Sequence, residues 1–423
     1  HCISSAASDV YKRQKGNYRV FAGENMTLFV GEGPLNKDGK RNPDARGLMI
    51  SDATVGLVKK GEGDAAEYAL SAEGQVSVVG ISGLSLSGPI SISYNGFTDV
   101  IDQAVAIAGT TKQVGVKFVN DQVAKVENDV REAFYEIKGF ETPIEIDVAG
   151  QRINAIFEVS RFTSDAGKAE GKADDSLMFK LTEVSASFGD GTSNFVTLSK
   201  GSGTLLSMPD GVALKAEGTV GVNAPSVELK EVQLKLKINN VERQITEKGV
   251  NGEELDLPAG PYTKFEGEDL KLVIAGQTLK GNFDFEKEAN GDVRGSVKNG
   301  GITISDSNSN PLIVLSDING GFEMSSEGVY GALRVKAAPV YDIPRVGLSD
   351  GTVTVQMNTV NKEKSFSFDP DVDVEGDLVD LELDEGPYLR VDVERANLVV
   401  KDGDLSLIHI SEPTRLGMIS YAV

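Results

Sequence analysis

A run of carboxylates at Asp369–Asp377, "DPDVDVEGD", carries the clearest chemistry in the sequence. Carboxylate oxygens suit the hard cation calcium. An EF-hand loop, however, needs glycine at its sixth position, where this run has Val374. The acidic residues also alternate with valines, as they do on the solvated face of a strand. The run therefore predicts a solvent-facing strand with no assigned metal ligand, and its calcium candidates are Asp369, Asp371 and Asp373.

A second motif, "GKAEGK" at Gly167–Lys172, resembles a phosphate-binding loop. That loop requires four residues between its glycines and a Ser or Thr after the lysine. Here three residues separate the glycines, and Ala173 follows the lysine. Residues 163–176 are therefore predicted to form a flexible surface loop, and no cofactor is expected.

Histidine and cysteine are confined to the two ends of the chain, as His1, Cys2 and His409. Histidine is the usual general base, and cysteine with histidine forms the usual zinc site. Residues 15–404 can therefore build no Ser-His-Asp triad, no Cys-His pair and no disulfide. We expect no catalytic activity. A pair of carboxylates acting on carbohydrate is the lowest-ranked alternative.

Both ends of the chain differ in character from the acidic, glycine-rich sequence between them. The run "SSAASDVYKRQ" at Ser4–Gln14 resembles the translation of a transposase-based library adapter, and "LSLIHISEPTR" at Leu405–Arg415 resembles the opposite adapter. We therefore leave residues 1–14 and 405–423 out of the fold prediction. The sequence between them is expected to be an internal fragment of a longer open reading frame.

The formal net charge of −22 restricts the partners that the chain could bind. Nucleic acid needs a basic surface, so this class of partner is not expected. No apolar run approaches the roughly 18 residues of a membrane helix, so no transmembrane segment is predicted. A strongly acidic surface favours solubility in a salty or calcium-rich medium, which is typical of an extracellular location.

The sequence between the two ends repeats itself. "YTKFEGEDLKLVIAGQTL" at Tyr262–Leu279 aligns without a gap with Tyr18–Leu35, and its first part aligns with Tyr388–Val400. Two further series of markers recur in the same order, Gly74, Gly211 and Gly328, then Asn95, Asn239 and Asn358. The predicted division is 1–14 adapter-like, 15–133 repeat 1, 134–259 repeat 2, 260–386 repeat 3, 387–404 the start of repeat 4, and 405–423 adapter-like. We expect the tyrosines to bury their rings, and the asparagines to close strands through bonds from side chain to backbone.

Alternation of apolar and polar residues predicts strands throughout, as in Leu234, Leu236 and Ile238, which are separated by lysines. Strands with one apolar face and one polar face are typical of antiparallel sheets. The predicted fold is therefore all-β, with long antiparallel strands in a continuous curved meander of tandem repeats of about 120 residues. The glycine pairs at 300–301 and 320–321 are predicted to mark bends or bulges.

Residues 119–137 are ambiguous, because Val119, Val123, Val126, Val130 and Phe134 follow a helical spacing. The corresponding part of repeat 3 has no helical pattern. We therefore favour strand and loop over helix for this segment.

The repeats resemble the long tandem repeats of giant bacterial surface and secreted proteins. The clearest marks are "AGQTLKGNFDFE" at Ala275–Glu286 and "GPYLRV" at Gly386–Val391. The resemblance implies an adhesin-like structural or spacer segment at the cell surface, whose partners are the neighbouring repeats of the same polypeptide. Repeat 1 departs from the pattern with "GEGP" in place of the "AGQ" turn, and repeat 2 has an insertion before Phe134. The alternative is an open β-groove, whose apolar face would hold or transfer lipid.

Overall fold

The computed structural model consists of β-strands, with no α-helix among the residues it describes. These residues are 11–15, 18–33, 42–63, 66–127, 130–162, 176–189, 193–224, 227–249, 252–274, 276–287, 292–305, 311–335, 346–349, 351–370, 378–394, 397–400, 408–409 and 414–419. The predicted all-β class with long antiparallel strands is therefore confirmed.

The strands have the following bounds. The first twelve are β1 (Tyr11–Lys15), β2 (Tyr18–Glu32), β3 (Arg46–Lys60), β4 (Glu67–Val79), β5 (Leu84–Asn95), β6 (Ile101–Ala106), β7 (Gln113–Phe118), β8 (Lys125–Glu127), β9 (Val130–Glu132), β10 (Phe134–Gly139), β11 (Ile144–Val148) and β12 (Gln151–Phe162). The next eleven are β13 (Ser176–Gly189), β14 (Asn194–Met208), β15 (Gly211–Ala224), β16 (Val227–Asn239), β17 (Ile245–Lys248), β18 (Glu254–Leu257), β19 (Tyr262–Ile274), β20 (Gln277–Lys287), β21 (Val293–Ser305), β22 (Pro311–Ser325) and β23 (Gly328–Val335). The last eight are β24 (Val346–Ser349), β25 (Thr352–Asn358), β26 (Lys364–Phe368), β27 (Val379–Leu383), β28 (Tyr388–Glu394), β29 (Asn397–Val400), β30 (Ile408–His409) and β31 (Thr414–Ile419).

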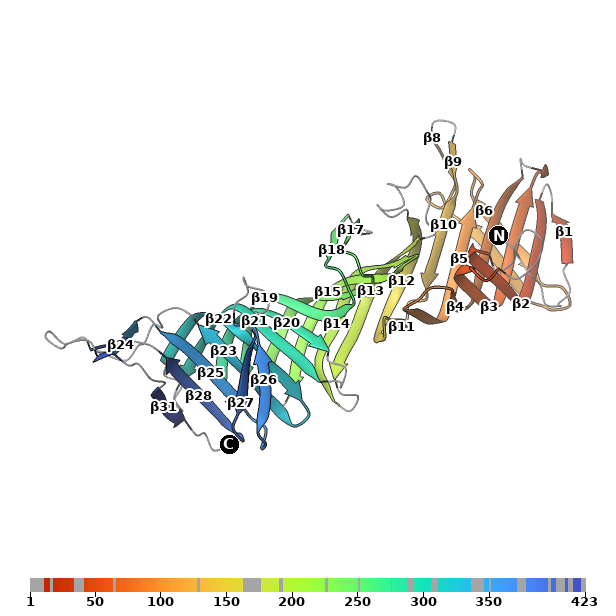
Figure 1. The fold of residues 1–423 in the computed structure, drawn as a ribbon. Helices are drawn as coiled ribbons and strands as arrows, with labels where there is room; N and C mark the ends of the chain where they lie inside the picture. The colour runs from red at the N-terminus through yellow and green to blue at the C-terminus, as the bar shows by residue number, and fades with distance from the viewer. Residues whose placement is uncertain are drawn as a thin grey trace. The chain divides into compact units, whose positions relative to one another are not determined.

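The chain forms two compact units, each described separately. The first comprises residues 1–185, 200–216 and 238–261, and the second comprises 186–199, 217–237 and 262–423. In the first unit, β2, β3 and β4 each pair with the next strand to form an antiparallel meander that ends at β5, and β10 and β11 continue it on the edge of β5. Figure 1 shows β2 to β5 side by side.

In the second unit, β19 to β23 form a second antiparallel meander, which β25 and β28 extend. The cross-strand register places Phe265, Phe285 and Phe322 on one face of this sheet. All three are at most 1% exposed, and the Phe265 ring packs 4.3 Å from that of Phe188. Phe322 also covers Gly295, where a Cβ atom would lie 2.4 Å from the ring. This apolar face is therefore a packed core.

The long strands contain bulges in their middles. Residues with positive φ lie within strands at Asn25, Asp52, Glu183, Lys200, Asp269, Asn299 and Asp317. The β2–β3, β19–β20 and β21–β22 registers all shift there. A bulge bends its strand and increases the local twist, which curves the sheet. The bulge predicted at Gly300–Gly301 is confirmed by the shift in the β21–β22 register.

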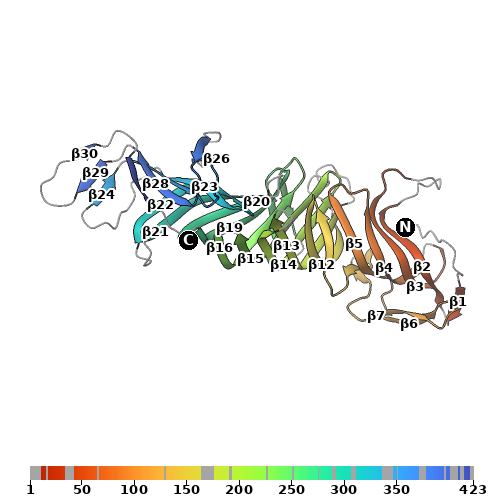
Figure 2. The same ribbon diagram turned by 90° about the horizontal axis from the view of Figure 1, so that it is seen from below.

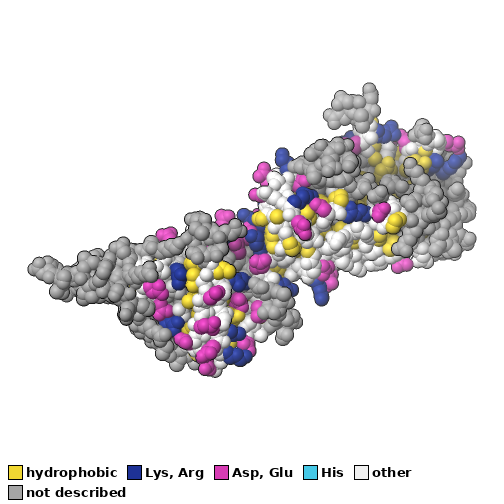
Figure 3. All heavy atoms as spheres, in the orientation of Figure 1, with side chains coloured by type: hydrophobic (Ala, Val, Ile, Leu, Met, Phe, Trp, Pro, Cys, Tyr) yellow, Lys and Arg dark blue, Asp and Glu magenta, His cyan; other side chains and the backbone are white. Residues whose placement is uncertain are grey.

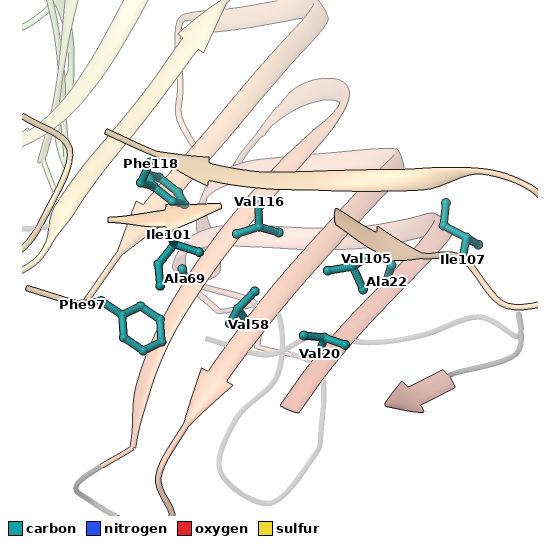
Figure 4. Packing of buried hydrophobic residues seen from close by; sticks show 10 residues of the cluster. All are labelled: Val20, Ala22, Val58, Ala69, Phe97, Ile101, Val105, Ile107, Val116 and Phe118. Atoms are coloured by element: carbon teal, nitrogen blue, oxygen red, sulfur yellow. The ribbon is translucent and has the colours of Figure 1, made fainter. Parts of the chain in front are cut away.

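Three short hairpins, β6–β7, β17–β18 and β26–β27, each cover the strands against which they pack. Figure 2 shows β6 and β7 crossing the face of β2 to β4, which they also contact. Their apolar side chains meet those of the sheet, as Figure 4 shows for Ile101, Val105 and Val116 over Val20 and Val58. The corresponding clusters under the other hairpins contain Ile245, Leu255 and Leu257, and Phe366, Phe368 and Leu383.

Two sequence interpretations are resolved by the strand bounds. Among the described residues of 119–137 there are turns and the strands β8, β9 and β10, so the strand-and-loop interpretation is confirmed. Gly211 and Gly328 each begin a strand, whereas Gly74 lies inside β4. The alignment of Gly74 with the other two glycines was therefore wrong. The segment from Tyr18 to Asn95, in predicted repeat 1, has four long strands, whereas the segment from Tyr262 to Asn358, in predicted repeat 3, has six, so Gly74 and Gly328 fall at different places in their strands.

The adapter-like ends do pair with the sheet, contrary to their exclusion from the fold. β1 pairs with the outer edge of β2, and β31 pairs with the outer edge of β28. An edge strand presents unpaired backbone donors and acceptors that accept any extended segment. Backbone pairing of this kind requires no particular side chains, so it agrees with the unrelated sequences of the two ends.

Candidate functional site

The most elaborate polar arrangement lies where a long strand ends and a covering hairpin begins. At the end of β25, Asn358 is fully buried. Its Oδ1 accepts a hydrogen bond from the N–H of Val360 at 2.8 Å, and its Nδ2 donates to the carbonyls of Lys362 and Asp384, both at 2.8 Å. The N–H of Gly386 then donates to the carbonyl of Val360 at 2.8 Å. One amide thus ties the end of a strand to both ends of the hairpin that follows it, an arrangement that we call the asparagine clamp.

The clamp recurs at the end of β16. Asn239 is fully buried, accepts from the N–H of Val241 at 2.9 Å and donates to the carbonyl of Pro258 at 2.7 Å. The N–H of Gly260 donates to the carbonyl of Val241 at 2.7 Å.

At the end of β5, Asn95 makes a similar set of bonds, with one carbonyl in place of two accepting from its Nδ2. It accepts from Phe97 at 3.0 Å and donates to Gln122 at 2.8 Å, while Ala124 donates to Phe97 at 2.8 Å. The expectation that these asparagines close strands through bonds to the backbone is confirmed at all three positions.

Glycine is required where the chain leaves two of the clamps. A Cβ atom on Gly260 would lie 2.1 Å from the carbonyl oxygen of Asn239, and one on Gly386 would lie 2.3 Å from that of Asn358. Each glycine precedes a cis-proline and then a tyrosine, Tyr262 or Tyr388. The tyrosine rings are half-buried, each beneath a cation two residues later, with Lys264 Nζ 5.2 Å from one ring centroid and the Arg390 guanidinium 5.5 Å from the other. Such cation–π contacts stabilise the start of the next strand.

A buried guanidinium lies beside the third clamp. Arg390 on β28 is 9% exposed and donates from Nε to Asp392 at 3.0 Å and from Nη1 to Asp384 at 2.6 Å. Its Nη2 donates to Gln356, and Gln356 Nε2 donates to Asp392 at 2.9 Å, which closes the network. Burial alone would lower the pKa of Arg390, but the charges of Asp392 and Asp384 outweigh it and raise the pKa. The group is therefore a fixed cation, each of whose three nitrogens donates to a side chain of this network.

A second charged cluster lies on β16, β19 and β20. Glu266 binds Lys264 at 2.6 Å and also binds Lys237. Burial opposes ionisation of Glu266, but the two lysines outweigh it and hold its pKa below the usual range. Asp284 lies directly opposite Glu266, and burial, together with that neighbouring carboxylate, raises the pKa of Asp284 despite the lysines.

The predicted calcium candidates are not brought together by the described part of the chain. Asp369 is exposed and follows directly after β26, in the connection between the two strands of the hairpin. Asp371 and Asp373 lie outside the described residues, as does the loop at 167–172. Among the residues that are described, no group of three or more ligating side chains could hold a metal ion.

The sequence indicated the asparagines but not the polar groups beside them. Gln356 stands two residues before Asn358, and Arg390 two residues after Tyr388. Comparison of these offsets among the predicted repeats would have found both residues, because Lys237 and Lys264 occupy the same offsets from Asn239 and Tyr262.

Comparison of the chain with protein-family models, with curated proteins and with solved structures gives no match. Nor do the described residues include a helix that is long and apolar enough to cross a membrane.

Proposed function

We propose that this chain is a structural spacer segment, built from tandem repeats, of a giant bacterial protein at the cell surface or outside the cell, with an adhesin-like role and no catalytic activity of its own. The observation that carries the proposal is the asparagine clamp, in which Asn95, Asn239 and Asn358 each accept from the N–H two residues later and donate to a carbonyl at the far end of the following hairpin. A repeated joint whose polar atoms are used internally favours a mechanical role over recognition of a small molecule.

The polar side chains around the clamps support the same proposal. Arg390 is bound by Asp384, Asp392 and Gln356, and Glu266 is bound by two lysines. A catalytic group needs a free donor, acceptor or lone pair directed at a substrate. These groups instead hold adjacent strands together.

The alternative, a groove that holds lipid, requires an apolar face open to an acyl chain. In the second compact unit, Phe265, Phe283 and Phe322 are at most 1% exposed. Phe283 and Phe322 pack edge to face with their centroids 6.5 Å apart. Packing of side chain on side chain at these positions favours the spacer over the groove.

The spacer proposal is tested by duplicating residues 260–386, the predicted repeat 3, within the full chain. A spacer should remain folded and gain length, so small-angle scattering should show a larger maximum dimension and circular dichroism an unchanged strand signal. A matched control inserts a flexible Gly/Ser segment of equal length, which adds disorder rather than strand signal. A duplicated chain that unfolds, or that gains no length, would contradict the proposal.

The groove alternative is tested separately by mass spectrometry of organic extracts from the purified chain. We expect no lipid above the level found with an unrelated acidic protein purified in parallel. Lipid recovered in proportion to protein would support the groove instead.

A further inference from the structure

The strands on either side of two clamps meet in the same register. The last strand before the clamp ends in asparagine, and the next long strand begins with an aromatic residue. Asn95 lies opposite Phe134 in the β5–β10 pair, and Asn358 lies opposite Tyr388 in the β25–β28 pair. We call each such pair of strands a joint, and extend the name to β16 and β19, which the ion pair of Lys237 with Glu266 connects.

Each joint carries polar side chains at three corresponding positions, two residues before the asparagine, and two and four residues after the aromatic residue. We call each set a joint triad. The triads are Ser93, Glu136 and Lys138 in the first joint, Lys237, Lys264 and Glu266 in the second, and Gln356, Arg390 and Asp392 in the third.

In every triad the two residues of the incoming strand form an ion pair. The distances are 3.0 Å for Lys138 with Glu136, 2.6 Å for Lys264 with Glu266 and 3.0 Å for Arg390 with Asp392. In the second and third joints the acidic member also binds the residue of the preceding strand, Lys237 or Gln356.

These bonds matter because strand alternation alone does not fix the register. A shift of one residue would move the apolar side chains to the wrong face, but a shift of two preserves the faces. After such a shift in the third joint, Gln356 would no longer lie opposite Arg390. The guanidinium, with a side chain 10% exposed, would lose a partner where water cannot fully replace it.

We propose that the joint triad is the recognition element by which the last strand of one repeat selects the register of the first strand of the next. The partner that this surface fits is therefore an extended strand with an aromatic residue, then two oppositely charged residues at the second and fourth positions after it. This inference rests on the proposed tandem-repeat function and identifies the contact through which consecutive repeats join.

The test measures strand register in the full chain with engineered disulfides, after replacement of Cys2 by serine. Thr352→Cys with Glu394→Cys reports the native register, since these residues lie directly opposite each other. Thr354→Cys with Glu394→Cys reports a shift of two residues. Asp392→Asn should raise the ratio of shifted to native cross-link about tenfold, because it removes the carboxylate that binds both Arg390 and Gln356.

Two variants separate register from general stability. Asp392→Glu, which copies the acidic residue of the second joint, should restore the native ratio. Gln356→Ser should raise the ratio of shifted to native cross-link, as Asp392→Asn does, because it removes the cross-strand partner of both Arg390 and Asp392. Asp380→Asn, on the exposed face of β27, is the matched control and should change nothing.

An unchanged ratio in Asp392→Asn would refute the register role. If this variant failed to fold, a native ratio in Gln356→Ser would refute the role equally, and a raised ratio in Gln356→Ser together with a native ratio in Asp392→Glu would support it. None of these outcomes alters the gain in length expected on duplication of a repeat, so the spacer proposal is tested independently.

Discussion

At the scale of single residues, the asparagine clamp shows why one residue type recurs at the strand ends. The site demands an acceptor for one N–H and donors for two carbonyls within a fully buried volume, as at Asn358. Asparagine supplies both from one planar group. Ionised aspartate supplies acceptors but no donor, and leucine supplies neither. A buried polar group without a partner is costly, so the position admits little substitution.

Asn358→Asp should therefore destabilise the fold by roughly 2–4 kcal/mol at neutral pH, because a buried carboxylate would face the carbonyls of Lys362 and Asp384. Protonation gives back one donor, so the loss should diminish as the pH falls. Urea unfolding at several pH values measures both effects. Asn282→Asp is the control, since Asn282 is exposed and only accepts, from the N–H of Asp269. Equal losses in both variants would contradict the role of the clamp.

Asp284 and Glu266 illustrate the opposite case, like charges on directly opposed residues. Burial and this neighbour raise the pKa of Asp284, so ionisation of Asp284 weakens the folded state above that pKa. Asp284→Asn should therefore stabilise the fold by about 0.2–1 kcal/mol at pH 7. The gain should shrink as the pH falls towards the unfolded value near 3.8, where the wild-type carboxyl is already protonated in the folded state.

Glu266→Gln should have the opposite sign. The lysines lower the pKa of Glu266, so its ionised form stabilises the fold above the unfolded value of 4.5, and that contribution is lost as the pH falls through the folded pKa. Thermal unfolding of both variants from pH 3 to 7 provides the measurement. A stabilising Glu266→Gln at pH 7 would contradict the assignment.

At the scale of elements, long strands and covering hairpins depend on local backbone geometry. Bulges at positive φ divide strands of up to 15 residues. Five of the seven residues with positive φ inside strands are Asn or Asp, the side chains that best tolerate this conformation after glycine. Glu183 and Lys200 are the exceptions. Their conformation could not be predicted from the sequence, because neither residue type signals a left-handed backbone.

Lys200→Gly should relieve this strain and stabilise the fold by about 0.5–1 kcal/mol, less the added entropy of the unfolded chain. Lys200→Asn should act in the same direction, and Lys200→Val should destabilise, because a β-branched residue fits this conformation poorly. Lys280→Gly, in β20 at ordinary φ, is the control and should lose stability. Destabilisation by Lys200→Gly as large as that by Lys280→Gly would contradict the bulge geometry. Chemical denaturation gives all four values.

The β6–β7 hairpin packs so closely against the sheet that only glycine fits beneath it at position 56. A Cβ atom on Gly56 would lie 2.8 Å from Val116 Cγ2 and 2.9 Å from Val114 Cγ1. Gly56→Val should therefore lift β7 and destabilise the fold by about 1–3 kcal/mol. Gly115→Val is the matched control, because a Cβ atom there meets nothing within 4 Å. Faster hydrogen exchange in β6 and β7 should accompany Gly56→Val alone, and equal effects of the two valines would refute this packing.

At the scale of the whole molecule, the sequence predicted what depends on local pattern. Alternation such as that of Leu234 and Leu236 predicted the all-β class, and the spacing of Asn239 and Asn358 predicted the strand ends. The pairing of Gln356 with Arg390 was not predicted, because it depends on the register of two strands more than 30 residues apart. Folding of β6 and β7 over the sheet and the division into two compact units were missed for the same reason, since both arise from long-range contacts.

The net charge of −22 also acts at this scale, and it leads to a prediction about ions. On the face shown in Figure 3, acidic side chains lie among basic ones, and Glu266 is an example of a carboxylate held by lysines. Neighbouring carboxylates on one strand face are about 6.7 Å apart, too far for oxygens that bind one calcium ion at about 2.3–2.6 Å. Charge spread in this way destabilises the fold only by self-repulsion, which salt screens beyond about 8 Å at physiological ionic strength.

Sodium chloride and calcium chloride at matched ionic strength should therefore raise the thermal midpoint of this chain by similar amounts. A calcium-specific site would behave differently, because an ion bound only by the folded state stabilises it by mass action, by about 2.7 kcal/mol at a hundred times the dissociation constant. Scanning calorimetry in the two salts measures the difference. A rise specific to calcium, abolished by Asp371→Asn with Asp373→Asn but retained in Asp102→Asn on the exposed face of β6, would establish a calcium site in the connection between β26 and β27 and overturn the screening account.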